Sequence, residues 1–154
     1  MKLSDAIVNM VEDEFDIAIR NAALKDSSFN ARKLASDKRL LVASPDYLAE
    51  HGKPATPQSL TEHRCIRLKG LEHWYCSSCK GEQSVKIKSK VSADNGEVVR
   101  VLALQRLGIT IYSTWIAKEY LASGKLATVL DDFSIVSSTD IWAVYPSFRQ
   151  LRLR

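Results

Sequence analysis

Several features that identify common protein classes are absent from this sequence, and each absence excludes a class. The 154 residues include three cysteines, an odd number that does not suggest a framework of disulfides. No apolar run approaches the roughly 20 residues that a membrane-spanning helix requires. Residues 1–15 carry acidic side chains where a signal peptide would carry its apolar stretch. The sequence therefore predicts a cytoplasmic protein with no membrane partner.

Motifs of catalysis and of nucleic-acid binding are also absent. The chain has no GxSxG elbow, no glycine-rich phosphate loop and no HExxH motif. Its 22 basic and 18 acidic residues are intermixed, and the net charge of +4 is mild. The basic clusters at 86–90 and 149–154 form no helix-turn-helix or zinc-finger pattern. We therefore expect neither an enzyme, nor a cofactor, nor direct contact with DNA.

The most regular stretch runs from Ala93 to Leu130, where helices and strands alternate. Asp94 is predicted to cap a helix, with Glu97 completing an acidic capping box and Gly108 ending the helix. Further elements follow, each with its own start and stop signals: a strand at 109–112, a helix at 115–122 capped by Ser113 or Thr114, and a strand at 126–130. This alternation predicts an α/β sandwich in which helices cover a largely parallel sheet.

The rest of the chain gives a coarser pattern. Ser44 is predicted to cap a helix that has Pro45 at its first position and ends at Gly52. The other predicted elements are a helix from Ser4, a strand at 15–20, a loop at 21–30, extended structure to Ala43, a helical turn at 58–63, a strand at 64–68, a hairpin at 74–93, a polar connection at 131–139 and a strand at 140–145.

Four phrases, in this order, resemble the effector-binding domain of LysR-type transcriptional regulators. They are FDIAIR, KLASDKRLLVASPDYLAEHGKPATPQSLTEHRCI, SADNGEVVRVLALQRLGI and IWAVYPS. The resemblance covers nearly the whole chain and implies a two-lobed α/β fold of the periplasmic-binding-protein kind (type II), with a small-molecule cleft between the lobes. Residues 1–37 and 134–154 would form a partial first lobe, and residues 38–133 a complete second lobe.

Parts of the family pattern have no counterpart in the chain, so we expect a domain truncated at both ends. The family's winged helix-turn-helix, the first strand and helix of the first lobe, and the final helix are missing. An incomplete first lobe would expose an apolar face unless a second subunit covered it. The resemblance thus implies the effector-sensing and oligomerisation part of a dimeric regulator whose DNA-binding segment lies elsewhere.

The candidate ligand-binding residues follow predicted strands or cap predicted helices. The resemblance places seven positions at the family's cleft: Asn21, Ala22, Ser44, Asp94, Asn95, Ser113 and Thr114. Helix N-termini with free N–H groups would suit a carboxylate or a phosphate, although Asp94 would repel an anion. The alternative is that these polar residues only cap helices, each contributing about 1 kcal/mol.

Two other functions compete with effector sensing. The chain could be a module that only self-associates and binds no ligand. Alternatively, the Cys76-x-x-Cys79 loop could hold half of a zinc site, completed by His73, Cys65 or His63. A structural zinc site needs a second ligand pair at similar spacing, and the sequence has none, so free thiols on a hairpin are the simpler expectation.

Overall fold

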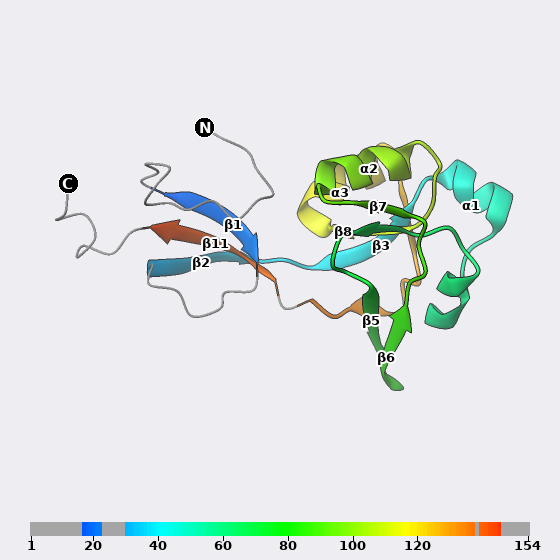
Figure 1. Cartoon of the computed structure of the whole chain (residues 1–154), viewed down its shortest axis with the longest axis horizontal. Helices are drawn as coiled ribbons and strands as arrows, with labels where there is room; N and C mark the ends of the chain where they lie inside the picture. The colour runs from blue at the N-terminus through cyan, green and yellow to red at the C-terminus, as the bar shows by residue number, and fades with distance from the viewer. Residues whose placement is uncertain (1–16, 23–29, 138, 146–154) are drawn as a thin grey trace. The chain divides into compact units, whose positions relative to one another are not determined.

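The computed structural model describes residues 17–22, 30–137 and 139–145, which belong to two compact units. The smaller unit comprises residues 1–37 and 138–154, and the larger unit comprises residues 38–137. Figure 1 shows the helices and strands of each unit. The helix predicted from Ser4 and the basic cluster at 149–154 lie outside the described residues.

The described part of the smaller unit is a three-stranded antiparallel sheet in the order β1-β11-β2. These strands are β1 (Ala18–Ala22), β11 (Asp140–Tyr145) and β2 (Asn30–Ser36). The predicted strand at 15–20 is therefore shifted toward the C-terminus, and β1 takes in two residues that the sequence assigned to a loop.

Apolar side chains are exposed on this small sheet. Val144 of the central strand β11 is buried, whereas Ile17 and Ile19 at the start of β1 are 57% and 62% exposed. Ile17 and Ile19 are two positions apart, so they lie on the same face of the sheet. Leu34, at the irregularity where β2 shifts register against β11, is 51% exposed.

The larger unit is a mixed α/β structure around one six-stranded sheet, whose order is β6-β5-β10-β3-β8 with β9 also pairing with β3. Its helices are α1 (Pro45–His51), the 3-10 helix η1 (Pro57–Thr61), α2 (Gly96–Leu104) and α3 (Thr114–Ala122). Its strands are β3 (Arg39–Ala43), β4 (Ile66–Leu68), β5 (His73–Ser78), β6 (Gly81–Lys86), β7 (Val91–Ala93), β8 (Thr110–Ser113), β9 (Ala127–Val129) and β10 (Ser134–Ile135).

The expectation of a largely parallel sheet is wrong. The described ladders of the six-stranded sheet are antiparallel, and the parallel ladder in this unit joins β4 to β7. Helix–strand alternation does set the direction of consecutive strands: β8 and β9, which α3 connects, both run antiparallel to β3 and hence parallel to each other. The alternation does not reveal that β3 is inserted between them, and that insertion makes the pairing of both strands with β3 antiparallel.

The strand β3 separates two hydrophobic cores because its side chains alternate between the two faces of the sheet. Leu41 and Ala43 belong to a core that includes Tyr47 of α1 and Trp74 of β5. Val42 belongs to a second core under the helices α2 and α3. Figure 1 shows these two helices together over β3, β7 and β8. A strand buried on both faces must be apolar throughout, which explains the continuous run of residues 40–43.

Several predicted boundaries need correction. Asn95, not Asp94, caps α2, since its side-chain oxygen accepts hydrogen bonds from the backbone N–H groups of Glu97 at 2.7 Å and Val98 at 3.3 Å. The predicted polar connection at 131–139 contains β10, which pairs with β3 and β5 in the larger unit. The predicted hairpin at 74–93 ends with β6, and β7 leaves it to pair with β4. Among the described residues, no helix is long and apolar enough to cross a membrane.

Candidate functional site

Strand directions in the larger unit bring three strand ends together. The strands β4 and β7 run parallel, and a parallel bridge between Cys65 and Ile109 gives β8 the same direction. All three therefore end on one side of the unit, where β3 begins, because Arg39 pairs with Ser113. The helices α2 and α3 follow β7 and β8 directly, so both begin at this strand end. We call it the β4–β7–β8 end.

Four of the predicted site residues lie at the β4–β7–β8 end. Asp94 and Asn95 follow β7, and Ser113 and Thr114 join β8 to α3. Ser113 is 8% exposed and makes no side-chain capping bond to α3. Thr114 donates two hydrogen bonds to the carbonyl oxygen of Lys38, from its backbone N–H at 2.8 Å and from Oγ1 at 2.7 Å. Thr114 thus fixes the start of α3 beside the first residue of the larger unit.

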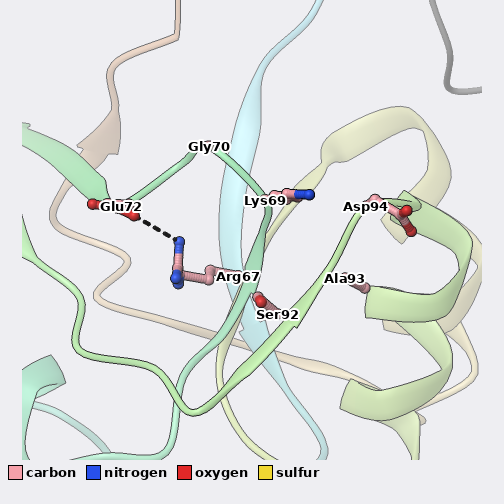
Figure 2. Close-up of a pocket in the computed structure, with 7 residues that line it drawn as sticks. All are labelled: Arg67, Lys69, Gly70, Glu72, Ser92, Ala93 and Asp94. Carbon is pink, nitrogen blue, oxygen red and sulfur yellow. Dashed lines mark hydrogen bonds and ion pairs between the residues drawn. The ribbon is translucent and has the colours of Figure 1, made fainter.

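A hollow of about 480 Å³ opens beside this group, at the ends of β4 and β7. Its wall is formed by Arg67, Lys69, Gly70, Glu72, Ser92, Ala93 and Asp94, which Figure 2 shows. The backbone N–H of Lys69 donates to the carbonyl oxygen of Ala93 at 2.7 Å and so continues the β4–β7 pairing to the rim.

The charged side chains of the hollow are one ion pair and two groups that have no partner among the described residues. Arg67 and Glu72 form an ion pair at 3.3 Å. In Figure 2 the side chain of Lys69 extends in the direction of Asp94, and neither side chain has an ion-pair or hydrogen-bond partner among the described residues. A cation and a carboxylate thus both remain available at the β4–β7–β8 end.

Ser44 lies at the opposite end of the strands. Because β3 runs antiparallel to β8, the end of β3 lies away from the β4–β7–β8 end. The hydroxyl of Ser44 caps α1 by accepting a hydrogen bond from the backbone N–H of Tyr47 at 3.3 Å. A second cavity of about 590 Å³ lies there, lined by Ser44, Pro45, Asp46, Leu104, Gln105, Arg106, Tyr120, Gly124 and Lys125. The structure therefore does not bring Ser44 together with Asp94, Asn95, Ser113 and Thr114.

The two remaining candidates, Asn21 and Ala22, belong to β1 in the smaller unit. The side-chain amide of Asn21 donates to Oδ2 of Asp37 at 2.8 Å, and Oγ1 of Thr139 donates to the same oxygen at 3.5 Å. Asp37 is 6% exposed. Asp37 is the last residue before the larger unit, and Thr139 follows shortly after the chain leaves that unit. The two hydrogen bonds of Asp37 therefore join β1 to both connecting segments.

The proposed zinc ligands are not assembled. Cys76 and Cys65 are buried in the same core, whereas Cys79 is exposed at the tip of the β5–β6 hairpin. Burial raises the pKa of Cys65 to about 12 and also raises that of Cys76, which disfavours the thiolate that binds metal. Among the described residues, no group of three or more His, Cys, Asp or Glu side chains is arranged for a metal ion.

Sequence reasoning missed Lys69, Arg67 and Asp37. Lys69 and Arg67 carry no motif, and only the pairing of β4 with β7 brings them beside Asp94. Asp37 entered the predictions only as the last residue of the segment 1–37 of the first lobe. A buried acid flanked by Ser36 and Lys38 has no local pattern that distinguishes it from a solvent-exposed turn residue.

Comparison with known proteins identifies the family. The family model of the LysR substrate binding domain matches residues 1–154. This chain belongs to that family. It is 35% identical over 160 residues to the HTH-type transcriptional activator TtdR of Escherichia coli strain K12, covering 99% of this chain and 51% of the relative. It is 32% identical over 154 residues to the HTH-type transcriptional regulator CrgA of Neisseria meningitidis strain MC58, covering 98% of this chain and 51% of CrgA.

Solved structures agree with this assignment. The CrgA regulatory domain from Neisseria meningitidis is 33% identical with a TM-score of 0.79, over 98% of this chain and 76% of that one. Full-length AphB, a virulence activator of Vibrio cholerae, is 31% identical with a TM-score of 0.78, over 90% of this chain and 48% of that one. The chain spans about half the length of the curated relatives that it matches.

The main prediction from the sequence is thereby confirmed. The chain is the effector-binding domain of a LysR-type transcriptional regulator, with a type II periplasmic-binding-protein-like α/β fold. The two alternatives, a ligand-free self-association module and a zinc-binding module, gain no support from these comparisons. The family is one of transcriptional regulators, which bind small-molecule effectors and act as oligomers.

Proposed function

We propose that this domain binds its effector at the β4–β7–β8 end of the larger unit. The observation that carries the proposal is that α2 and α3 begin at the same strand end, beside a hollow with a cation and a carboxylate that have no partner among the described residues. Asp94, Asn95, Ser113 and Thr114 would line the site, and Lys69 joins them.

The chemistry of these groups favours a small polar effector with two kinds of functional group. The ammonium group of Lys69 would hold a carboxylate or another anionic oxygen. The carboxylate of Asp94 accepts hydrogen bonds, so it would hold a hydroxyl or an amine of the same molecule. A ligand that carries both an acid and a hydrogen-bond donor would pair with Lys69 and with Asp94. A ligand with anionic groups alone would be repelled by the carboxylate of Asp94.

Asn21 and Ala22, in β1 of the smaller unit, stay proposed ligand-binding positions because of the family resemblance. The side-chain amide of Asn21 donates to Asp37 within that unit. Ser44, by contrast, would take no part in this site because it caps α1 at the other end of the strands.

Effector binding would control the rest of the regulator. We propose that a DNA-binding segment outside this chain responds to the occupied domain, in keeping with relatives that are described as HTH-type regulators and are about twice as long. A regulator that must reach DNA would act in the cytoplasm. The domain itself would bind and release its effector without catalysis.

We also propose that α2 takes part in self-association. Its inner face packs Val99 and Ala103 into the second core, yet Val98 and Val101 remain 47% and 45% exposed. These two valines are three residues apart and therefore lie side by side on the helix. A helix that is apolar on both faces is suited to a partner subunit.

The effector proposal is tested by thermal denaturation with a panel of small organic acids, amino acids and sugar acids. At least one compound should raise the melting temperature of the wild-type domain, since a ligand present at 100 times its dissociation constant stabilises by about 2.7 kcal/mol. D94N and K69M should each lose most of this shift without a change in the melting temperature of the free domain, because neither side chain has a described partner.

The matched controls are K118M and E119Q, which change exposed charges on α3 away from the hollow. Both should keep the ligand-induced shift. A shift that survives in D94N and K69M would place the site elsewhere, and the absence of a shift with every compound would contradict effector binding by this chain.

A further inference from the structure

Two of the chain's three histidines surround one buried tyrosine at a corner of the larger unit that the effector proposal does not use. Tyr47 lies in the first turn of α1 and is 0% exposed. His51, at the end of the same helix, stacks on its ring with the centroids 4.4 Å apart and the planes at 13°. His63, after η1, tilts against it at 6.1 Å. We call Tyr47, His51, His63 and Arg64 the Tyr47 cluster.

The hydrogen bonds at the phenol are all satisfied when His63 is neutral. The backbone N–H of Arg64 donates to Oη of Tyr47 at 3.0 Å. The phenol hydrogen is then free to donate to Nδ1 of His63, which lies 3.3 Å from Oη. Burial raises the pKa of Tyr47, so the phenol keeps this hydrogen. A ring nitrogen that accepts a hydrogen bond carries no proton, so His63 would hold its single proton on Nε2.

The hydrogen bonds of His51 also require a neutral ring, with the opposite tautomer. Nδ1 of His51 lies 3.2 Å from the carbonyl oxygen of Tyr47, which can only accept, so Nδ1 must donate. Nε2 lies 2.9 Å from the guanidinium of Arg64, which can only donate, so Nε2 must accept. A protonated His51 would direct a second donor at Arg64.

We propose that the Tyr47 cluster is a proton-sensitive latch, which holds α1 to the segment before β4 while both histidines are neutral and releases it when they are protonated. Every contact in the cluster between α1 and residues 63–64 passes through Tyr47 or His51. Protonation of His63 removes the acceptor for the phenol hydrogen of Tyr47, and protonation of His51 directs a second donor at the guanidinium of Arg64.

The surrounding charges oppose protonation of His63. The guanidinium of Arg64 lies 5.6 Å from the centroid of Tyr47, so a charged His63 would place a second cation beside this buried ring. The nearby acids are Glu50, whose Oε2 lies 4.0 Å from Nδ1 of His51, and Glu62, which adjoins His63; both are exposed. Cys65 is neutral because burial raises its pKa to about 12. The pKa of His63 is lowered, first by burial and next by the charge of His51, although Glu62 acts in the opposite direction.

The sign of the pH effect follows from these contacts. A histidine whose pKa is lower in the folded than in the unfolded chain binds fewer protons when folded. The stability that His63 contributes is complete at a pH above 6.5, the pKa of histidine in the unfolded chain. It falls as the pH drops below 6.5 toward the lower pKa of His63 in the folded chain. Acidification should therefore loosen α1. This helix also carries Asp46, which pairs with Arg106 at 2.8 Å in the wall of the second cavity, so the effect would reach that cavity.

The first test is nitrogen NMR of the histidine rings of the full chain at pH 7.5. Only three histidines are present, which makes assignment direct. We expect His51 to carry its proton on Nδ1 and His63 on Nε2. His63 should take up its proton at a lower pH than a histidine in the unfolded chain, whose pKa is 6.5. The same tautomer at His51 and His63, or a His63 titration that matches the unfolded chain, would overturn the proposal.

The second test compares melting temperatures at pH 7.5 and pH 5.5 for wild type, H63N and H73N. Asparagine places a carbonyl oxygen near the position of Nδ1, so H63N keeps an acceptor for Tyr47 that cannot be protonated. Wild type and H73N should lose a few degrees more than H63N on acidification. An equal loss in all three proteins would overturn the latch. Should H63N fail to fold at pH 7.5, the ring-nitrogen measurement on the wild-type chain still decides the matter.

Discussion

Gly108 brings two backbone segments closer than a side chain would allow. A Cβ atom at this position would overlap the carbonyl oxygen of Arg64, which accepts a hydrogen bond from the backbone N–H of Ile109 at 2.9 Å. That hydrogen bond and its neighbour, from the N–H of Ile66 to the oxygen of Ile109 at 2.8 Å, attach β4 to the start of β8. The glycine therefore supports the strand arrangement on which the proposed effector site depends.

We expect G108A to lower the free energy of unfolding by about 2 kcal/mol or more, because the clash is with backbone and cannot be relieved by a rotamer change. Urea denaturation followed by circular dichroism measures this. The matched control is G96A in the first turn of α2, where an added Cβ meets nothing within 4 Å. Its stability should be unchanged or higher by up to about 1 kcal/mol. Equal stability of G108A and G96A would show that the close approach at 108 is not required.

Among the elements, α2 combines two roles. Its N-terminus follows Asp94 at the proposed effector site, while its outward face carries Val98 and Val101. On the side toward α3, Arg100 forms an ion pair with Glu97, donates to the hydroxyl of Tyr120 and lies 5.0 Å from the centroid of that ring. Arg100 thus fixes α2 to α3. Effector binding that displaced the N-terminus of α2 would therefore also displace Val98 and Val101, and with them a subunit packed on these valines.

We expect the double variant V98E/V101E to weaken self-association at least tenfold, which corresponds to about 1.4 kcal/mol. The fold should be kept because both side chains are already half-exposed. Analytical ultracentrifugation over a concentration series gives the dissociation constant. The control, K118E/S123E, changes exposed positions on α3 and just after it, and should associate as wild type does. A wild-type chain that stays monomeric at micromolar concentration would contradict the proposed role of α2.

On the scale of the whole molecule, the two hydrophobic cores that the described residues form lie within residues 38–137. The first core joins α1 and the β5–β6 hairpin to one face of β3, and the second joins α2 and α3 to the other. The described part of the smaller unit is a three-stranded sheet with exposed isoleucines. Among the described residues, burial is thus concentrated in the larger unit, which is also continuous in sequence.

We therefore expect a polypeptide of residues 38–137 to fold by itself. It should unfold cooperatively on heating, and its amide resonances for α2, α3 and β8 should match those of the full chain. Because Lys69, Asp94 and Asn95 remain in this polypeptide, it should also retain part of the ligand-induced shift in melting temperature. A broad, non-cooperative transition would show that the smaller unit is needed to complete a core.

The sequence by itself determined the family, the order of most helices and strands, and the caps that depend on neighbouring residues. Ser44 and Pro45 start α1 and Gly52 ends it as predicted, because helix capping is a contact between residues a few positions apart. The choice of Asp94 over Asn95 as a cap failed because adjacent Asp and Asn side chains are nearly equivalent as caps, and the local sequence does not separate them.

Only the tertiary structure decided which strand ends meet. The antiparallel insertion of β3 beside β8 moved Ser44 away from the other candidates, and the pairing of β4 with β7 brought Lys69 to Asp94. It likewise placed His63 and Arg64 on Tyr47, some 16 and 17 positions away in the chain. Hydrophobic periodicity reports which face of an element is buried, but not which distant element buries it. A site assembled from several elements is therefore visible only when the chain is folded.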